Sequence, residues 1–125
     1  MKILVTGALG KVVRATTKAL QAAGHEVVAT DLARPSFERK PDDAPAYVQA
    51  DLTDAGEAYA VVRGMDAVVH AAAIPEPTQN PPHVVFRTNI MATFNVLEAA
   101  VRFGVKRFVN ISSETVPGFF FPERP

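Results

Sequence analysis

The hydrophobic positions of this chain follow two patterns that alternate along its length. Short runs rich in valine, isoleucine and alanine predict buried strands, and apolar residues that recur at three- and four-residue steps predict helices with one buried face. Two further segments, 34–45 and 74–82, carry three and four prolines and predict loops. The pattern predicts strands at 2–6, 26–30, 46–49, 67–70 and 106–111, and helices at 10–23, 55–63 and 83–103.

This order of elements predicts an α/β fold. Because most of the strands are apolar throughout, we expect a parallel sheet with helices on both faces. Right-handed crossovers between strands then give a Rossmann-type doubly wound sheet with strand order 3-2-1-4-5. Ligands of such sheets bind at the carboxyl ends of the strands, where the order reverses between strands one and four. Candidate functional residues are therefore those that follow each strand.

Composition narrows the classes of function. The chain has 125 residues, enough for one domain with a sizeable core, and its formal net charge is zero. No segment is basic enough to suggest a nucleic-acid partner. The chain contains no cysteine, so disulfides and thiolate chemistry are excluded, and we expect no metal site. We find no apolar run that approaches a membrane span and no leader-like start, so we expect no membrane contact and a cytoplasmic location.

The clearest motif is a glycine turn between the first strand and the first helix, Thr6-Gly7-x-x-Gly10-x-x-Val13. We expect Gly7 and Gly10 to supply the positive φ of a tight turn and room for a ligand near the backbone. The helix start that follows would direct free N–H groups and the positive end of its dipole at an anion. An ordinary strand-to-helix turn with two glycines has the same spacing, so the motif alone leaves both interpretations open.

Val13 stands where dinucleotide-binding fingerprints carry a third glycine, which lets the helix pack closely on the strand. We expect Val13 either to push the helix outward or to find a gap in the sheet. If the position is close-packed, Val13→Gly should tighten dinucleotide binding by relieving a wedged side chain.

Asp31 ends the second strand, about twenty residues after the glycine turn. A carboxylate at this place can accept hydrogen bonds from both hydroxyls of an adenosine ribose, and it repels a 2′-phosphate, which favours NAD over NADP. The alternative is a turn aspartate that caps the backbone of Leu32 or Ala33.

Two more groups of residues follow strands. Asp51 can accept from an adenine amino group while Leu52 packs on the ring, although a helix-capping turn explains this pair equally well. Ala71, Ala72 and Ala73 would let the backbone run close beneath a cofactor, but three alanines are also consistent with compact core.

Three longer segments add a resemblance to a known family. Residues 69–73 (Val-His-Ala-Ala-Ala), 88–100 (Thr-Asn-Ile-Met-Ala-Thr-Phe-Asn-Val-Leu-Glu-Ala-Ala) and 105–113 (Val-Lys-Arg-Phe-Val-Asn-Ile-Ser-Ser) follow the glycine turn in order. Together they resemble the NAD-dependent epimerase/dehydratase family of extended short-chain dehydrogenases, collinearly from Met1 to about Gly118. Within that family the chain looks most similar to uronate dehydrogenases.

The resemblance implies a Rossmann domain over residues 1–125 that binds NAD. It would be the N-terminal part of an enzyme that transfers hydride to or from a sugar or sugar acid. The resemblance also implies that Asn89 supports the site from the long helix, the alternative being a helix amide satisfied by a neighbouring carbonyl. Ser113 aligns with the family's active-site hydroxyl, which hydrogen-bonds the substrate oxygen; the alternative is a strand-end turn. The residues implied to wrap the pyrophosphate are Gly7, Leu9, Gly10, Lys11 and Val12.

The chain departs from the family in one respect that bears on activity. The family's chemistry needs a tyrosine with a lysine four positions later, because the lysine lowers the tyrosine pKa toward neutral pH. The tyrosines of this chain, Tyr47 and Tyr59, have Asp51 and Arg63 at that position. We therefore expect a sheet truncated after strand five, without the remaining strands and substrate region, and no catalysis by the chain alone.

Two other hypotheses stay open: a dinucleotide-binding module without chemistry, and a truncated fragment that binds little. An unpaired fifth strand is also a template for another chain. Phe119, Phe120 and Phe121 follow it, so we expect self-association through this end of the chain.

Overall fold

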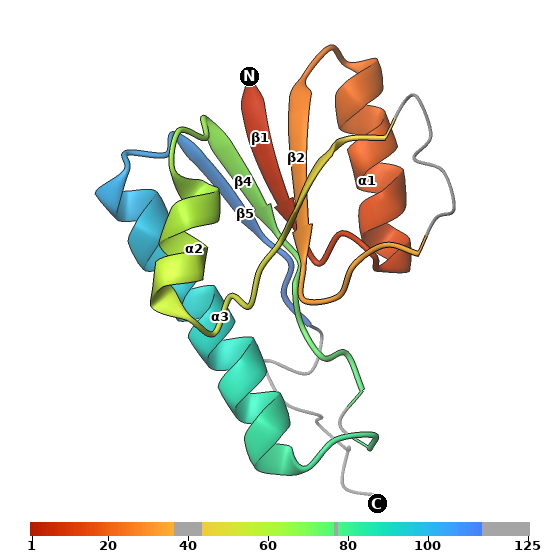
Figure 1. Ribbon diagram of the computed structural model, residues 1–125, viewed down its shortest axis with the longest axis vertical. Helices are drawn as coiled ribbons and strands as arrows, with labels where there is room; N and C mark the ends of the chain where they lie inside the picture. The colour runs from red at the N-terminus through yellow and green to blue at the C-terminus, as the bar shows by residue number, and fades with distance from the viewer. Residues whose placement is uncertain (37–43, 77, 114–125) are drawn as a thin grey trace, which may run out of the picture.

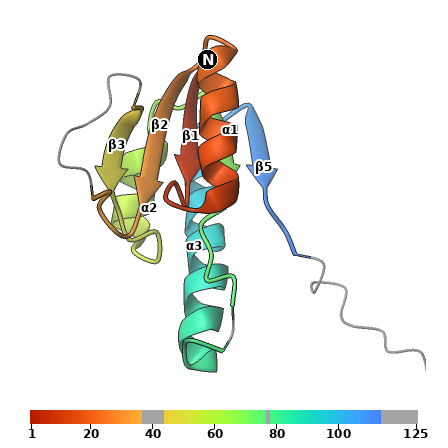
Figure 2. The same cartoon turned by 90° about the vertical axis from the view of Figure 1, so that its right-hand side faces the viewer.

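The computed structural model describes residues 1–36, 44–76 and 78–113. Five parallel strands in this part of the chain form one sheet in the order β3-β2-β1-β4-β5, and helices pack on its faces (Figures 1 and 2). The predicted α/β class, the doubly wound order and the element boundaries, to within one residue, are confirmed. The elements are β1 (Lys2–Thr6), α1 (Lys11–Ala22), β2 (Glu26–Asp31), β3 (Ala46–Gln49), α2 (Ala55–Val62), β4 (Ala67–His70), α3 (Pro82–Arg102) and β5 (Arg107–Asn110).

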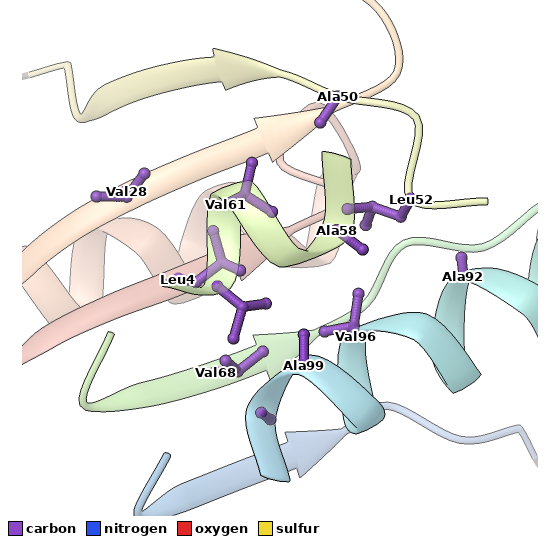
Figure 3. Close-up of a cluster of buried hydrophobic side chains, with 12 residues drawn as sticks. Leu4, Val28, Ala50, Leu52, Ala58, Val61, Val68, Ala92, Val96 and Ala99 are labelled. Atoms are coloured by element: carbon purple, nitrogen blue, oxygen red, sulfur yellow. The ribbon is translucent and has the colours of Figure 1, made fainter. Parts of the chain in front are cut away.

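The helices divide between the two faces of the sheet. α1 lies on one face, against β1 and β2, while α2 and α3 lie together on the other (Figures 1 and 2). Leu4 and Val28 from the strands meet Ala58 of α2 and Val96 of α3 in a buried cluster (Figure 3). Successive strand residues point to opposite faces, so Ile3 belongs instead to the cluster beneath α1.

The expectation that no apolar stretch is as long as a membrane span is wrong. α3 has 21 residues, and by length and composition alone it could cross a membrane. Its most apolar window has a mean hydropathy of 1.2. The helix nevertheless packs on the sheet. Four of its residues are at most 5% exposed and belong to the core: Ala92, Val96, Ala99 and Ala100. We interpret α3 as a core helix whose outer side is also apolar, with Phe86 69% exposed.

Val13 is part of the core between α1 and the sheet. Its side chain is 3% exposed and packs in a cluster with Ile3, Val5 and Val27, whereas the adjacent Val12 is 68% exposed. The valine therefore fills a gap, which was one of the two predicted outcomes. The expected gain in dinucleotide affinity from Val13→Gly assumed a wedged side chain, and this packing removes that reason.

We expect Val13→Gly to lower the free energy of unfolding by about 3 kcal/mol, because it removes a buried side chain and puts glycine in a helix. Val12→Gly changes an exposed residue of the same turn and should cost less than about 1 kcal/mol. Urea denaturation followed by circular dichroism measures both. Equal losses for the two variants would show that the Val13 side chain contributes no packing energy.

Candidate functional site

The glycine turn joins β1 to α1 at the carboxyl edge of the sheet. Gly7 has a φ of +69°, a conformation that other residues rarely adopt. The Gly10 N–H donates to the Gly7 carbonyl at 2.9 Å, and the Ala8 N–H donates to the Thr30 carbonyl at 3.1 Å. The turn is therefore closed on itself and tied to β2.

Gly7 also lies against the backbone that follows β4. A Cβ atom at Gly7 would lie 2.8 Å from the carbonyl oxygen of Ala71 and 2.9 Å from the Cα of Ala72, closer than Cβ atoms approach backbone in proteins. The glycine turn and the alanine segment after β4 are thus in direct backbone contact. Gly10 differs from the expectation, because its φ is −68°. Glycine is favoured there by space, since a Cβ would lie 3.1 Å from the Gly7 carbonyl.

The N-terminus of α1 follows the turn and is open to an anion. Gly10 is the N-cap, has no side-chain cap hydrogen bond, and precedes a first helical turn without acidic residues. The first N–H groups of a helix have no acceptor within it, and here they belong to Lys11, Val12 and Val13. Lys11 and Val12 are exposed, so this helix end can receive a phosphate, which the helix dipole favours.

Asp31 ends β2 beside the glycine turn. Its Oδ2 accepts the Leu9 N–H at 3.0 Å, and its Oδ1 accepts the Ala33 N–H at 3.4 Å. The turn that caps Ala33 is therefore present, together with a contact to the glycine turn that the sequence did not predict. An ionised carboxylate offers about four lone-pair positions. Two of them remain for the two hydroxyls of a ribose.

A cavity of about 680 Å³ lies between α1 and the residues around β3. Leu9, whose N–H contacts Asp31, is in its wall. The wall also includes three cationic side chains, Arg14, Lys18 and Arg34. Positive charge in this wall would partly offset the repulsion between Asp31 and a 2′-phosphate bound at the cavity.

Asp51 and Leu52 form a turn after β3. The Oδ1 of Asp51 accepts the N–H and the hydroxyl of Thr53 at 2.9 and 2.8 Å, and Asp54 caps α2 by accepting the Glu57 N–H at 2.9 Å. The capping turn that was the alternative is thus present. Leu52 is 5% exposed and lies in the core (Figure 3). Contact with adenine at this residue would fall mainly to its backbone.

α3 holds two loops of this edge through asparagine side chains. The Oδ1 of Asn89 accepts the Ile74 N–H at 2.8 Å, and its Nδ2 donates to the Ile74 carbonyl at 3.1 Å. Asn95 is 4% exposed and donates from Nδ2 to the carbonyls of Leu52 and Thr53, each at 3.0 Å. Asn95 was not predicted from the sequence. An amide on the buried side of an apolar helix is the signal that points to it.

Further polar contacts join β1, β4 and α3 beneath the turn. His70 is 2% exposed, and its Nδ1 lies 2.8 Å from the Thr6 hydroxyl, while its Nε2 lies 3.1 Å from the Thr93 hydroxyl. Burial lowers the pKa of His70 to about 4, so the ring is neutral near pH 7. None of these three side chains was predicted as functional. A histidine that ends an otherwise apolar strand is the signal that points to His70, but it does not identify the two threonines.

The remaining predicted residues lie in the outer part of this edge. Ala73 is exposed, and Ser113 is exposed three residues beyond the end of β5. The Ile111 N–H donates to the His70 carbonyl at 2.9 Å, so the chain after β5 starts beside the chain after β4. Among residues 1–36, 44–76 and 78–113, no group of three or more histidine, aspartate and glutamate side chains could hold a metal ion.

A glycine turn at the switch point of a doubly wound sheet, with a carboxylate at the end of the next strand, is how Rossmann-type domains bind dinucleotides. The described chain has this class of fold and this arrangement of residues. Comparison with protein families is more specific, because residues 3–123 match the NAD dependent epimerase/dehydratase family. The chain belongs to that family, as its motifs predicted.

Individual relatives agree with this assignment. A 3 beta-hydroxysteroid dehydrogenase/Delta 5→4-isomerase from Mycobacterium tuberculosis is 36% identical over 126 residues, covering 92% of this chain and 32% of the relative. A uronate dehydrogenase from Pseudomonas syringae pv. tomato is 34% identical over 124 residues, covering 95% of this chain and 42% of the relative.

Among solved structures, a mutant uronate dehydrogenase from Agrobacterium tumefaciens complexed with NAD is 34% identical, with a TM-score of 0.75. That match covers 90% of this chain and 40% of the other. The chain therefore spans less than half the length of these relatives.

Proposed function

We propose that this chain binds NAD across the carboxyl edge of its sheet, as the dinucleotide-binding part of a dehydrogenase, epimerase or dehydratase that acts on a sugar or sugar acid. The observation that carries the proposal is the hydrogen bond from the Leu9 N–H to Asp31, at 3.0 Å. It holds a ribose-binding carboxylate beside the turn that would receive the pyrophosphate. The two recognition elements for an adenosine diphosphate are thereby adjacent.

Each proposed contact follows from groups that the fold leaves available. The first N–H groups of α1 and the turn between Gly7 and Gly10 would bind the pyrophosphate. Asp31 would accept from both hydroxyls of the adenosine ribose. Asp51 would meet the adenine amino group through Oδ2, because Thr53 occupies Oδ1. Bound NAD supplies the hydride acceptor or donor.

Ser113 is the proposed catalytic side chain, and it would hydrogen-bond the substrate oxygen as hydride moves. A serine hydroxyl needs a neighbouring base to take part in proton transfer near neutral pH. The tyrosine–lysine pair of the family is not among the residues of this chain. We therefore propose that the 125-residue chain alone binds NAD without turnover.

The proposed substrate class rests on the relatives. Uronate dehydrogenases match this chain both by sequence and by structure, which favours a sugar acid. The hydroxysteroid dehydrogenase matches at similar identity, so a steroid alcohol is the competing class.

We expect NAD to bind the chain at least about tenfold more tightly than NADP, because Asp31 would face the 2′-phosphate. Asp31→Asn should narrow this preference, mainly by improving NADP binding, since Arg14, Lys18 and Arg34 are nearby cations. Calorimetric titration with each nucleotide measures the preference. Asp54→Asn is the matched control, because it removes a carboxylate at the N-cap of α2 and keeps a capping side chain.

The outcomes of this titration distinguish a wrong role for Asp31 from a wrong proposed function. NADP binding as tight as NAD binding in the unmodified chain would contradict the role of Asp31. Failure of both nucleotides to bind would contradict the proposed function itself.

We also propose that the chain self-associates through the β5 edge. β5 is an outer strand of the described sheet, and Val109 and Ile111 are each 51% exposed. Open strand edges readily pair with other chains. Phe119, Phe120 and Phe121, which were predicted to contribute, lie outside the described residues.

Light scattering should therefore show dimers or larger species at micromolar concentration. Changing Phe119, Phe120 and Phe121 to serine should reduce the share of these species, because serine removes the apolar surface of the three rings. Val101→Ser, at a site on α3 that is 80% exposed, is the control and should leave the size distribution unchanged. A monomer at all concentrations would contradict the proposal.

A further inference from the structure

The position of the proton on His70 follows from its neighbours. At the α3 end, the Thr93 hydroxyl donates to the Asn89 carbonyl at 2.7 Å. A hydroxyl has one proton, so Thr93 can meet the Nε2 of His70, 3.1 Å away, only as an acceptor. His70 must therefore carry its proton on Nε2.

The β1 end gives the same answer independently. The N–H groups of Ala71 and Ala72 both donate to the Thr6 hydroxyl oxygen at 3.1 Å. These two bonds use both lone pairs of that oxygen. Thr6 can then contact the Nδ1 of His70, at 2.8 Å, only by donating its own proton. Nδ1 is thus an acceptor, as a neutral ring protonated on Nε2 requires.

Donors and acceptors are therefore ordered in one direction, from the alanine backbone through Thr6, His70 and Thr93 to α3. Reversing either bond to His70 would place two donors or two acceptors face to face elsewhere in the series, so the series has a single arrangement. The imidazolium form is excluded at neutral pH by burial, which lowers the pKa of His70 to about 4. A proton on Nδ1 would also meet a Thr6 oxygen whose lone pairs are both in use.

The backbone that this series holds is the segment that packs against the glycine turn. The carbonyl of Ala71 and the Cα of Ala72 are the atoms that lie 2.8 and 2.9 Å from the position of a Cβ on Gly7. A shift of this backbone by a few tenths of an ångström toward the turn would press on Gly7, and a shift away would loosen its contact with the turn. The position of the Ala71–Ala72 backbone therefore determines the geometry of the glycine turn.

We propose that His70 is a positioning residue for the dinucleotide. Through Thr6 it fixes the Ala71–Ala72 backbone against Gly7, and through Thr93 it couples that backbone to α3. His70 itself contacts neither substrate nor reacting atoms in this role. The inference rests on the proposed function, because it names the support of the backbone at the proposed dinucleotide site.

Two neighbouring threonines provide a matched test. Thr6 and Thr30 are register partners on β1 and β2 and are both 0% exposed. Within the described structure, however, the Thr30 hydroxyl has no hydrogen-bond partner. Thr6→Val should weaken NAD binding roughly tenfold, while Thr6→Ser, which keeps the hydroxyl, should bind as the unmodified chain does. Thr30→Val should leave the affinity unchanged, and equal affinities for the two valine variants would overturn the proposal.

Nitrogen NMR of the His70 ring tests the series without any nucleotide or substitution. The ring should carry its proton on Nε2 and none on Nδ1 from about pH 5.5 to 8. A tautomer protonated on Nδ1, or a mixture of the two, would overturn the proposal. This measurement uses the unmodified chain, so it tests the hydrogen-bond series even if Thr6→Val does not fold.

Amide hydrogen exchange separates this proposal from the proposed function. If the unmodified chain binds no NAD, the proposed function fails, and exchange at Ala71 and Ala72 then decides on the role of His70. Faster exchange of these two amides in Thr93→Val, but not in Thr30→Val, would support the coupling from α3. Equal protection in both variants would overturn it.

Discussion

The contact between Gly7 and the backbone after β4 is the constraint on which the rest of the site depends. β1 and β4 are neighbours at the point where the strand order reverses, so their ends converge beneath the N-terminus of α1. Gly7 allows this convergence because it has a positive φ and no side chain. A Cβ at this position would lie only 2.8 Å from the Ala71 carbonyl oxygen. A larger residue would force the turn away from the strand end and move the helix that is proposed to receive the pyrophosphate.

α3 supplies much of the support for this edge. Asn89 holds Ile74, Thr93 contacts His70, and Asn95 holds the loop after β3. These three side chains lie within about two turns of one helix. One helix therefore holds both of the segments that follow β3 and β4, and this edge of the sheet is largely preformed. Preformed sites bind with less loss of conformational freedom.

The fold could be predicted because apolar strands and three- to four-residue helix periods are properties of the chain alone. The contacts within the site could not, because they join residues distant in sequence: the bond from Leu9 to Asp31 depends on how β2 ends beside the turn. Buried polar residues such as His70 read in the sequence as interruptions of an apolar pattern, which does not name their partners. Val13 departs from the glycine of the fingerprint, and the sequence alone does not show that it fits, because the gap that it fills is formed by residues of the sheet.

Gly7→Ala tests the central contact most directly, with Gly24→Ala as its control. Both glycines have positive φ, 69° and 79°, so both variants carry similar backbone strain, but nothing lies within 4 Å of a Cβ at Gly24. The measurement is the dissociation constant for NAD at a temperature where both variants are folded. We predict binding weakened at least about tenfold in Gly7→Ala and unchanged in Gly24→Ala. Unchanged affinity in Gly7→Ala would contradict the role of this contact.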